Sequence, residues 1–339
     1  MIKINRSVEL IDMLKFEHYK YFNTKNPKDY KDLTYRRLLR HYAYYSINPN
    51  HRSFFNHLYK KRKILLIGSA QDLHNEIEII ETTFQHILPE IKNKNSFLYK
   101  SITKVFDYSS FTTRANTVWG AYKLVTKLGI KVCPYCNRQY TTTYYTSSGK
   151  SKGKTRATLD HFYDKGTHPY LALSLFNLIP SCSICNSSFK GKEKFNINDY
   201  IHPYDSDFGK NIPFQLDYDE ENLQYEDLIT DTNKFEISLN FKKEPNRKHA
   251  ENAERTALVF KIKEIYNEHK DIVAELLQKK IVYTNDYIDS IYKEHGNIFY
   301  SNDDVYKMII GNYIAEDDLE KRVMAKFTKD IAKQIGFKF

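Results

Sequence analysis

The four cysteines of this chain are the residues whose spacing most directly predicts chemistry. They form two Cys-x-x-Cys pairs, Cys133/Cys136 and Cys182/Cys185, and the chain contains no other cysteine. A two-residue gap lets one tight turn aim both sulfurs at a single ion, and four thiolates satisfy the tetrahedral coordination of Zn²⁺. We therefore expect one structural zinc ion held by all four cysteines.

A second interpretation applies to the first pair, because Cys133-Pro134-Tyr135-Cys136 is also the redox-active sequence of glutaredoxins. A glutaredoxin dithiol opens a helix near the start of a small βαβ domain, where the helix terminus lowers the pKa of the thiol. Here the sequence lies in the middle of the chain, and residues 137–145 after it carry β-branched and aromatic side chains that favour a strand. The second cysteine pair also favours zinc over a redox dithiol.

The segment between the two pairs contains polar residues in a distinctive order. Forty-five residues separate Cys136 from Cys182, whereas the pairs of a zinc ribbon are typically about 15–20 residues apart. In sequence order, the residues of this segment and just beyond it are Asp160, His161, Asn177, Leu178, Asn186, Lys190 and Gly191. The order resembles the HNH endonuclease family, in its zinc-containing form with two Cys-x-x-Cys knuckles.

The resemblance implies a role for each matching position. His161 would be the general base, and Asp160 and Asn186 would hold a catalytic Mg²⁺ or Mn²⁺ ion. Asn177 would be a framework residue whose amide hydrogen-bonds the backbone and holds the loop that carries His161. These residue types suit phosphodiester cleavage, because a neutral imidazole can accept a proton near neutral pH and a hard cation prefers oxygen ligands.

Basic residues near the motif predict contacts with phosphates. Residues 126–205 contain eleven lysines and arginines against five acidic residues, a net charge of +6, and the whole chain carries +10. The residues expected to contact nucleic acid are Lys152, Lys154, Arg156, Lys190 and Lys192. The run at 150–156 has an equally simple alternative as the solvated tip of a hairpin.

The elements that must position these residues divide the chain into three segments. Residues 1–125 have apolar side chains at helical spacing, and residues 126–205 contain the motif. Residues 206–339 begin with a short β-element, marked by alternating apolar residues from Phe235, and continue as helices. The expected class is α+β: a mostly helical chain with a central ββα-metal (HNH) nuclease module around the zinc site. If residues 157–163 form a strand, Asp160 and His161 point to opposite faces unless a turn re-aims one of them.

The first functional hypothesis is a metal-dependent HNH endonuclease acting on DNA. RNA stays open as the substrate, since nothing in the sequence reads a 2′-hydroxyl. The flanking residues resemble, more loosely, nuclease subunits of bacterial anti-phage systems such as Septu and retron-linked operons, which would add an ATPase subunit as a partner. The alternative is a zinc-dependent nucleic-acid-binding or assembly module without catalysis, although the presence of both Asp160 and His161 favours the enzyme. Without a signal peptide or a long apolar run, we expect a cytoplasmic protein that does not contact membranes.

Overall fold

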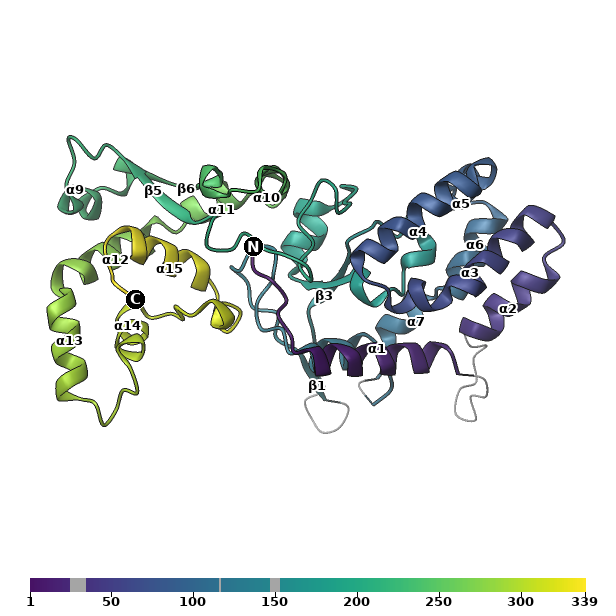
Figure 1. Cartoon of the computed structure of the whole chain (residues 1–339), viewed down its shortest axis with the longest axis horizontal. Coiled ribbons are helices and arrows are strands. Elements are labelled where there is room, and N and C mark those ends of the chain that lie inside the picture. Colours follow the sequence, from purple (N-terminus) through teal and green to yellow (C-terminus); the bar gives the residue numbers. More distant parts are fainter. Residues whose placement is uncertain (25–34, 116, 147–152) are drawn as a thin grey trace.

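The described chain is built of helices and three small sheets (Figure 1). The computed structural model describes residues 1–24, 35–115, 117–146 and 153–339. Each sheet consists of two antiparallel strands, and helices form most of the described chain. The predicted α+β class is therefore confirmed. No helix within the described ranges is long and apolar enough to cross a membrane.

The described residues of the first part of the chain form helices, and several of these begin at strong caps. The side chain of Ser7 accepts a hydrogen bond from the backbone of Leu10, and Ser69 and Asp72 form a capping box. These caps satisfy amide groups that a helix leaves unpaired at its start. The elements are α1 (Val8–Phe22), α2 (Tyr35–Tyr45), α3 (Pro49–Ile67), α4 (Ala70–Thr83), η1 (Gln85–Ile87), α5 (Leu88–Lys92), α6 (Phe97–Val105) and α7 (Tyr108–Thr113).

The middle of the chain contains two hairpins and the cysteine pairs. Its elements are α8 (Ala121–Leu128), β1 (Tyr144–Thr146), β2 (Gly153–Thr155), β3 (Thr158–His161), η2 (Pro169–Leu171), η3 (Leu175–Asn177), β4 (Leu178–Ser181) and η4 (Ile184–Lys190), a π-helix. β3 pairs with β4 so that Asp160 lies opposite Ile179 and His161 opposite Leu178. α8 crosses the expected segment boundary at residues 125/126.

The last part of the chain packs helices around a third hairpin. Its elements are β5 (Phe214–Tyr218), α9 (Tyr225–Thr230), η5 (Thr232–Lys234), β6 (Phe235–Leu239), η6 (Phe241–Lys243), α10 (Arg247–Val259), α11 (Ile262–Asn267), α12 (Lys270–Val282), α13 (Asn285–Glu294), α14 (Asn302–Ile310), η7 (Glu316–Asp318) and α15 (Ala325–Gln334). Figure 1 places the helices of the first part on one side of β3 and these elements on the other.

Asn137, which follows the first cysteine pair, joins the last part of the chain to the middle. Its backbone has a φ of 52°, which is uncommon for a residue other than glycine. Its carbonyl accepts a hydrogen bond from Met324 N, and its side chain bonds Leu319 O and Lys326 N at 3.1 and 3.2 Å. Three bonds to residues far along the chain explain why the structure keeps this conformation.

His18 is buried in the core as a neutral imidazole. Trp119 Nε1 donates to His18 Nδ1 at 3.1 Å, and His18 Nε2 donates to the carbonyl of Leu173 at 2.7 Å. Burial lowers the pKa of His18 to about 4 from an ordinary value of 6.5. The folded state therefore binds this proton less readily than the unfolded state does.

Acidification is accordingly expected to destabilise the fold through His18. The contribution of His18 to the free energy of unfolding is complete above pH 6.5 and declines as the pH falls toward 4. In that range only the unfolded chain binds a proton at His18. At pH 5 the loss is about 2 kcal/mol for this one residue. The measurement is the free energy of unfolding at pH 7 and pH 5, with His18→Gln as the comparison. Glutamine can accept from Trp119 and donate to Leu173 but does not titrate, so an equal loss in both proteins would contradict the assignment.

Candidate active site and four-cysteine cluster

The four cysteines form one buried cluster, as their spacing predicts. Their sulfur atoms all lie within 4.8 Å of one another, and all four residues are buried. Four sulfurs around a tetrahedral zinc ion with bonds near 2.3 Å are separated by roughly 3.8 Å. The cluster therefore has the size and the ligand type of a zinc site, and the four cysteines could hold one ion.

Backbone amides complete the two knuckles. Arg138 N donates to Cys136 Sγ, and Cys185 N donates to Cys182 Sγ, both at 3.4 Å. Hydrogen bonds from Cys133 and the other thiols lower the pKa of Cys182, and bonds within the same group raise the pKa of Cys185.

Tyr135 connects the first knuckle to β3. It lies between Cys133 and Cys136, is fully buried, and stacks on Phe260 with ring centroids 4.3 Å apart. Its hydroxyl donates to Asp160 Oδ2 at 2.7 Å. The position of the Asp160 carboxylate therefore depends on the cysteine cluster.

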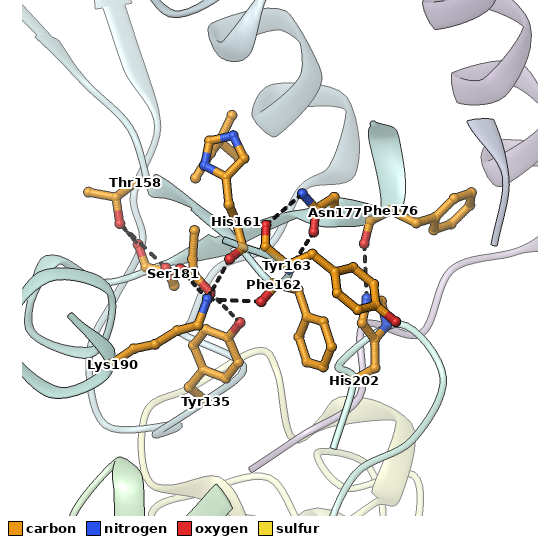
Figure 2. A network of polar contacts seen from close by, with 12 residues as sticks. Tyr135, Thr158, His161, Phe162, Tyr163, Phe176, Asn177, Ser181, Lys190 and His202 are labelled. Carbon is orange, nitrogen blue, oxygen red and sulfur yellow. Dashed lines mark hydrogen bonds and ion pairs between the residues drawn. The ribbon is translucent and has the colours of Figure 1, made fainter. Parts of the chain in front are cut away.

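Lys190 is the second partner of Asp160 and lines the cavity described below. Its Nζ lies 2.9 Å from each carboxylate oxygen of Asp160. It also donates to the carbonyl oxygen of His161 at 2.5 Å (Figure 2). The Lys190 and Asp160 side chains are only 3% and 6% exposed. Lys190 was expected to contact phosphates, but its ammonium group is enclosed at the end of η4 and is used in internal bonds. Spacing alone does not show which way a long side chain turns, so these internal bonds could not be predicted.

Replacing Lys190 with methionine is expected to lower the free energy of unfolding by about 3–5 kcal/mol, because it leaves a buried carboxylate without its counter-charge. Lys192→Met, two residues away and exposed, should change stability little. The measurement is chemical denaturation of both variants and of Lys190→Met/Asp160→Asn. The double variant should regain part of the loss, since it removes both charges. A double variant no more stable than Lys190→Met would show that the ion pair is not the cause.

His161, the last residue of β3, is held as a neutral imidazole. Its Nε2 lies 3.1 Å from the carbonyl of Ala172, and since a carbonyl only accepts, Nε2 carries the proton and Nδ1 keeps a lone pair. Burial, reinforced by the charge of Lys165, lowers the pKa of His161 to about 3. Its ring also packs edge-on against Tyr108, with centroids 4.4 Å apart.

Asn177 ties together the loop that follows His161. Its Oδ1 accepts from Tyr163 N at 2.6 Å, and its Nδ2 donates to the carbonyls of Tyr163 and Leu171 at 3.1 Å each. The side chain is fully buried between these groups (Figure 2). Asn177 is thus bonded to both ends of the turn after β3, away from solvent.

A cavity of about 420 Å³ brings the remaining candidate residues together. Asp160, His161 and Asn186 all line it, although simple alternation along β3 would send the first two to opposite faces. β3 ends at His161, and the turn after it allows both side chains to border one space. Arg156 lines the same cavity, and its buried Nε has no hydrogen-bond partner among the described residues.

Among the other predicted phosphate contacts, Lys190 also lines this cavity, whereas the described residues Lys154 and Lys192 do not. Lys154 on β2 and Lys192 after η4 are both exposed. Lys152 lies outside the described residues. Among the five predicted basic contacts, Arg156 alone both lines the cavity and keeps a donor that is unused in the described chain.

Sequence reasoning missed three residues that shape the site: Tyr108, Tyr135 and Lys165. Tyr108 lines the cavity, donates to Leu159 O at 3.2 Å, and lies beneath Lys165 Nζ, which is 4.5 Å from the ring centroid. The position of Tyr135 inside the knuckle was visible in the sequence, but its bond to Asp160 was not. Tyr108 lies far upstream of the motif, and no sequence signal marks it.

No model of a known protein family matches this chain, and neither the curated proteins nor the solved structures contain a match. What the chain does is therefore argued from the site itself.

Proposed function

We propose that this protein is a metal-dependent HNH-type endonuclease that hydrolyses phosphodiester bonds in DNA. The observation that carries the proposal is that Asp160, His161 and Asn186 line one cavity. These are the positions that the motif assigns to the base and to the metal ligands. Two antiparallel strands followed by the π-helix η4 support a ββα-metal module around the cysteine cluster.

His161 would take a proton from the attacking water at Nδ1. The bond from Nε2 to Ala172 fixes the tautomer and leaves the Nδ1 lone pair for this task. A pKa of about 3 makes the imidazole neutral at physiological pH. A phosphodiester in the cavity brings negative charge, which raises the pKa of His161 and strengthens it as a base.

Asp160 and Asn186 would hold a divalent cation such as Mg²⁺ or Mn²⁺. The Asp160 carboxylate accepts three bonds from Tyr135 and Lys190, and a carboxylate offers about four lone-pair sites, so it retains capacity for a further partner. Asn186 adds an amide oxygen on the same cavity. When bound, such an ion stabilises charge on the phosphate and on the leaving oxygen.

Arg156 would bind a non-bridging phosphate oxygen. A buried guanidinium nitrogen without a partner is costly, and an anionic acceptor in the cavity would satisfy it. A zinc ion in the cysteine cluster would serve structure, because Tyr135 ties that cluster to Asp160.

The biological role is proposed from the motif's flanks. These resemble nuclease subunits of bacterial anti-phage systems, which supports a defence effector that works with an ATPase subunit. The local net charge of +6 supports a polyanionic substrate.

The test is incubation of the purified protein with supercoiled plasmid and with total RNA, in Mg²⁺, in Mn²⁺ and in EDTA. Plasmid cleavage that requires a divalent ion is the expected result. Cleavage of RNA alone would contradict the DNA substrate and support an RNA-cleaving nuclease. Salt-dependent binding without cleavage of DNA or RNA would contradict the nuclease and support the non-catalytic binding module.

A further inference from the structure

The α2–α3 hairpin carries an unusually one-sided charge. Residues 35–67, which include both helices, contain eight lysines and arginines and no aspartate or glutamate. The two helices pack against each other as an antiparallel pair at the end of the molecule away from β5 (Figure 1). Positive charges on neighbouring helical turns repel one another and destabilise the helix pair. A cluster of charge of one sign instead attracts a polyanion.

The exposed side of α2 combines these cations with aromatic rings. We define the α2 surface as the exposed residues Arg37, Arg40, His41, Tyr44 and Tyr45. Arg37 and Arg40 form no ion pair within the described ranges. The two tyrosines are 58% and 73% exposed.

The rings of the α2 surface are arranged beside an open groove. The Arg40 guanidinium lies 5.6 Å from the Tyr44 ring centroid, and the His41 and Tyr45 rings are 5.3 Å apart. Tyr45 also borders a groove of about 630 Å³, whose wall includes Ile47 (94% exposed). Exposed aromatic and apolar side chains gathered beside a groove commonly mark a binding surface.

We propose that the α2 surface binds single-stranded nucleic acid, with Arg37 and Arg40 on phosphates and Tyr44 and Tyr45 stacked on bases. Arg37 and Arg40 precede Tyr44 and Tyr45 along α2, so a strand lying on this surface would meet the cations with its phosphates and the rings with its bases. Base faces are available only in a single strand, since a duplex stacks them internally. An acidic protein partner would use the charges but would leave the stacking geometry without a role. The inference rests on the proposed function, which makes nucleic acid the relevant ligand. It deepens that function by identifying a single strand as the form of nucleic acid that this surface binds.

The experiment is fluorescence anisotropy with labelled dT20 and with a 20-base-pair duplex, in EDTA so that no cleavage occurs. Tyr44→Ala and Tyr45→Ala are each expected to weaken dT20 binding roughly 5- to 100-fold and to change duplex binding little. Arg37→Gln/Arg40→Gln should lower the slope of log affinity against log salt by about 1.4 for dT20. Tyr300→Ala and Lys242→Gln/Lys243→Gln, exposed elsewhere, are the matched controls.

The outcomes separate this inference from the nuclease proposal. Hydrolysis of bis(p-nitrophenyl) phosphate needs only the cavity, so the α2 variants should retain it in full, which also shows that they are folded. Loss of dT20 binding with retained hydrolysis supports the inference. Tyrosine-dependent dT20 binding in a protein without hydrolysis would overturn the nuclease and leave the inference standing. The inference would be overturned if both tyrosine variants bound dT20 with wild-type affinity, or if they lost equal affinity for dT20 and for the duplex.

Discussion

Replacing Cys182 with serine, or stripping the metal with a chelator, is expected to unfold the middle of the protein. Structural zinc contributes about 10–16 kcal/mol in small zinc domains, whereas a whole domain is typically stable by about 5–15 kcal/mol. The cluster is buried, and Asn137 beside it anchors residues from Leu319 to Lys326. Loss of the ion should therefore release the last part of the chain as well as the site.

Elemental analysis should find one zinc per chain, and circular dichroism should report the melting of each variant. Ser183→Ala is the matched control, because Ser183 lies within the same knuckle but is exposed. It is expected to retain zinc and to melt as the wild type does. A protein without zinc, or one whose native thiols react as a redox pair, would contradict the zinc assignment and restore the glutaredoxin interpretation.

His161→Ala is expected to lower the cleavage rate by roughly 10²- to 10⁴-fold, the usual worth of a general base. The variant keeps Asp160 and Asn186, so its demand for Mn²⁺ should stay near that of the wild type. Asn186→Ala should instead raise the metal concentration needed for half-maximal cleavage, and excess Mn²⁺ should partly restore it. The measurement is the cleavage rate against metal concentration, with His295→Ala, an exposed histidine, as the control.

Asn186 is a cleaner probe of metal binding than Asp160. Asp160→Ala would also strand the buried ammonium of Lys190, so a loss of activity could reflect a loss of structure. Rescue of His161→Ala by excess metal, or full activity of the wild type in EDTA, would contradict the proposed division of roles.

The cysteine cluster could be predicted from the sequence because chelation imposes a short local spacing. A two-residue gap lets one tight turn direct both sulfurs of a pair at the same ion. The two pairs contain all four cysteines of the chain, and together they supply the four ligands of one ion. The strand at Phe235 was likewise visible, since alternating burial has a local period, and β6 (Phe235–Leu239) confirms it.

The parts that escaped prediction depend on tertiary contacts. Helices were expected after the β-element of residues 206–339, but the break between α10 and α11 at Lys261, whose φ is 52°, could not be located from the sequence. Lysine carries no signal for that conformation, which glycine or asparagine would have indicated. The burial of Lys190 and the packing of Tyr108 on His161 arise from partners distant in sequence, so periodicity could not reveal them.

The enclosure of Asp160 has a consequence for how this sequence can vary between lineages. Tyr135 and Lys190 reach the carboxylate from opposite sides of the motif in sequence, and each supplies donors that the other cannot replace. Exchange of Lys190 for a neutral residue leaves the buried carboxylate of Asp160 without a counter-charge, and loss of Asp160 leaves the buried ammonium of Lys190 unpaired. Substitutions at positions 160 and 190 should therefore be inherited together, and drift at position 135 should be confined to side chains that still donate a hydrogen bond.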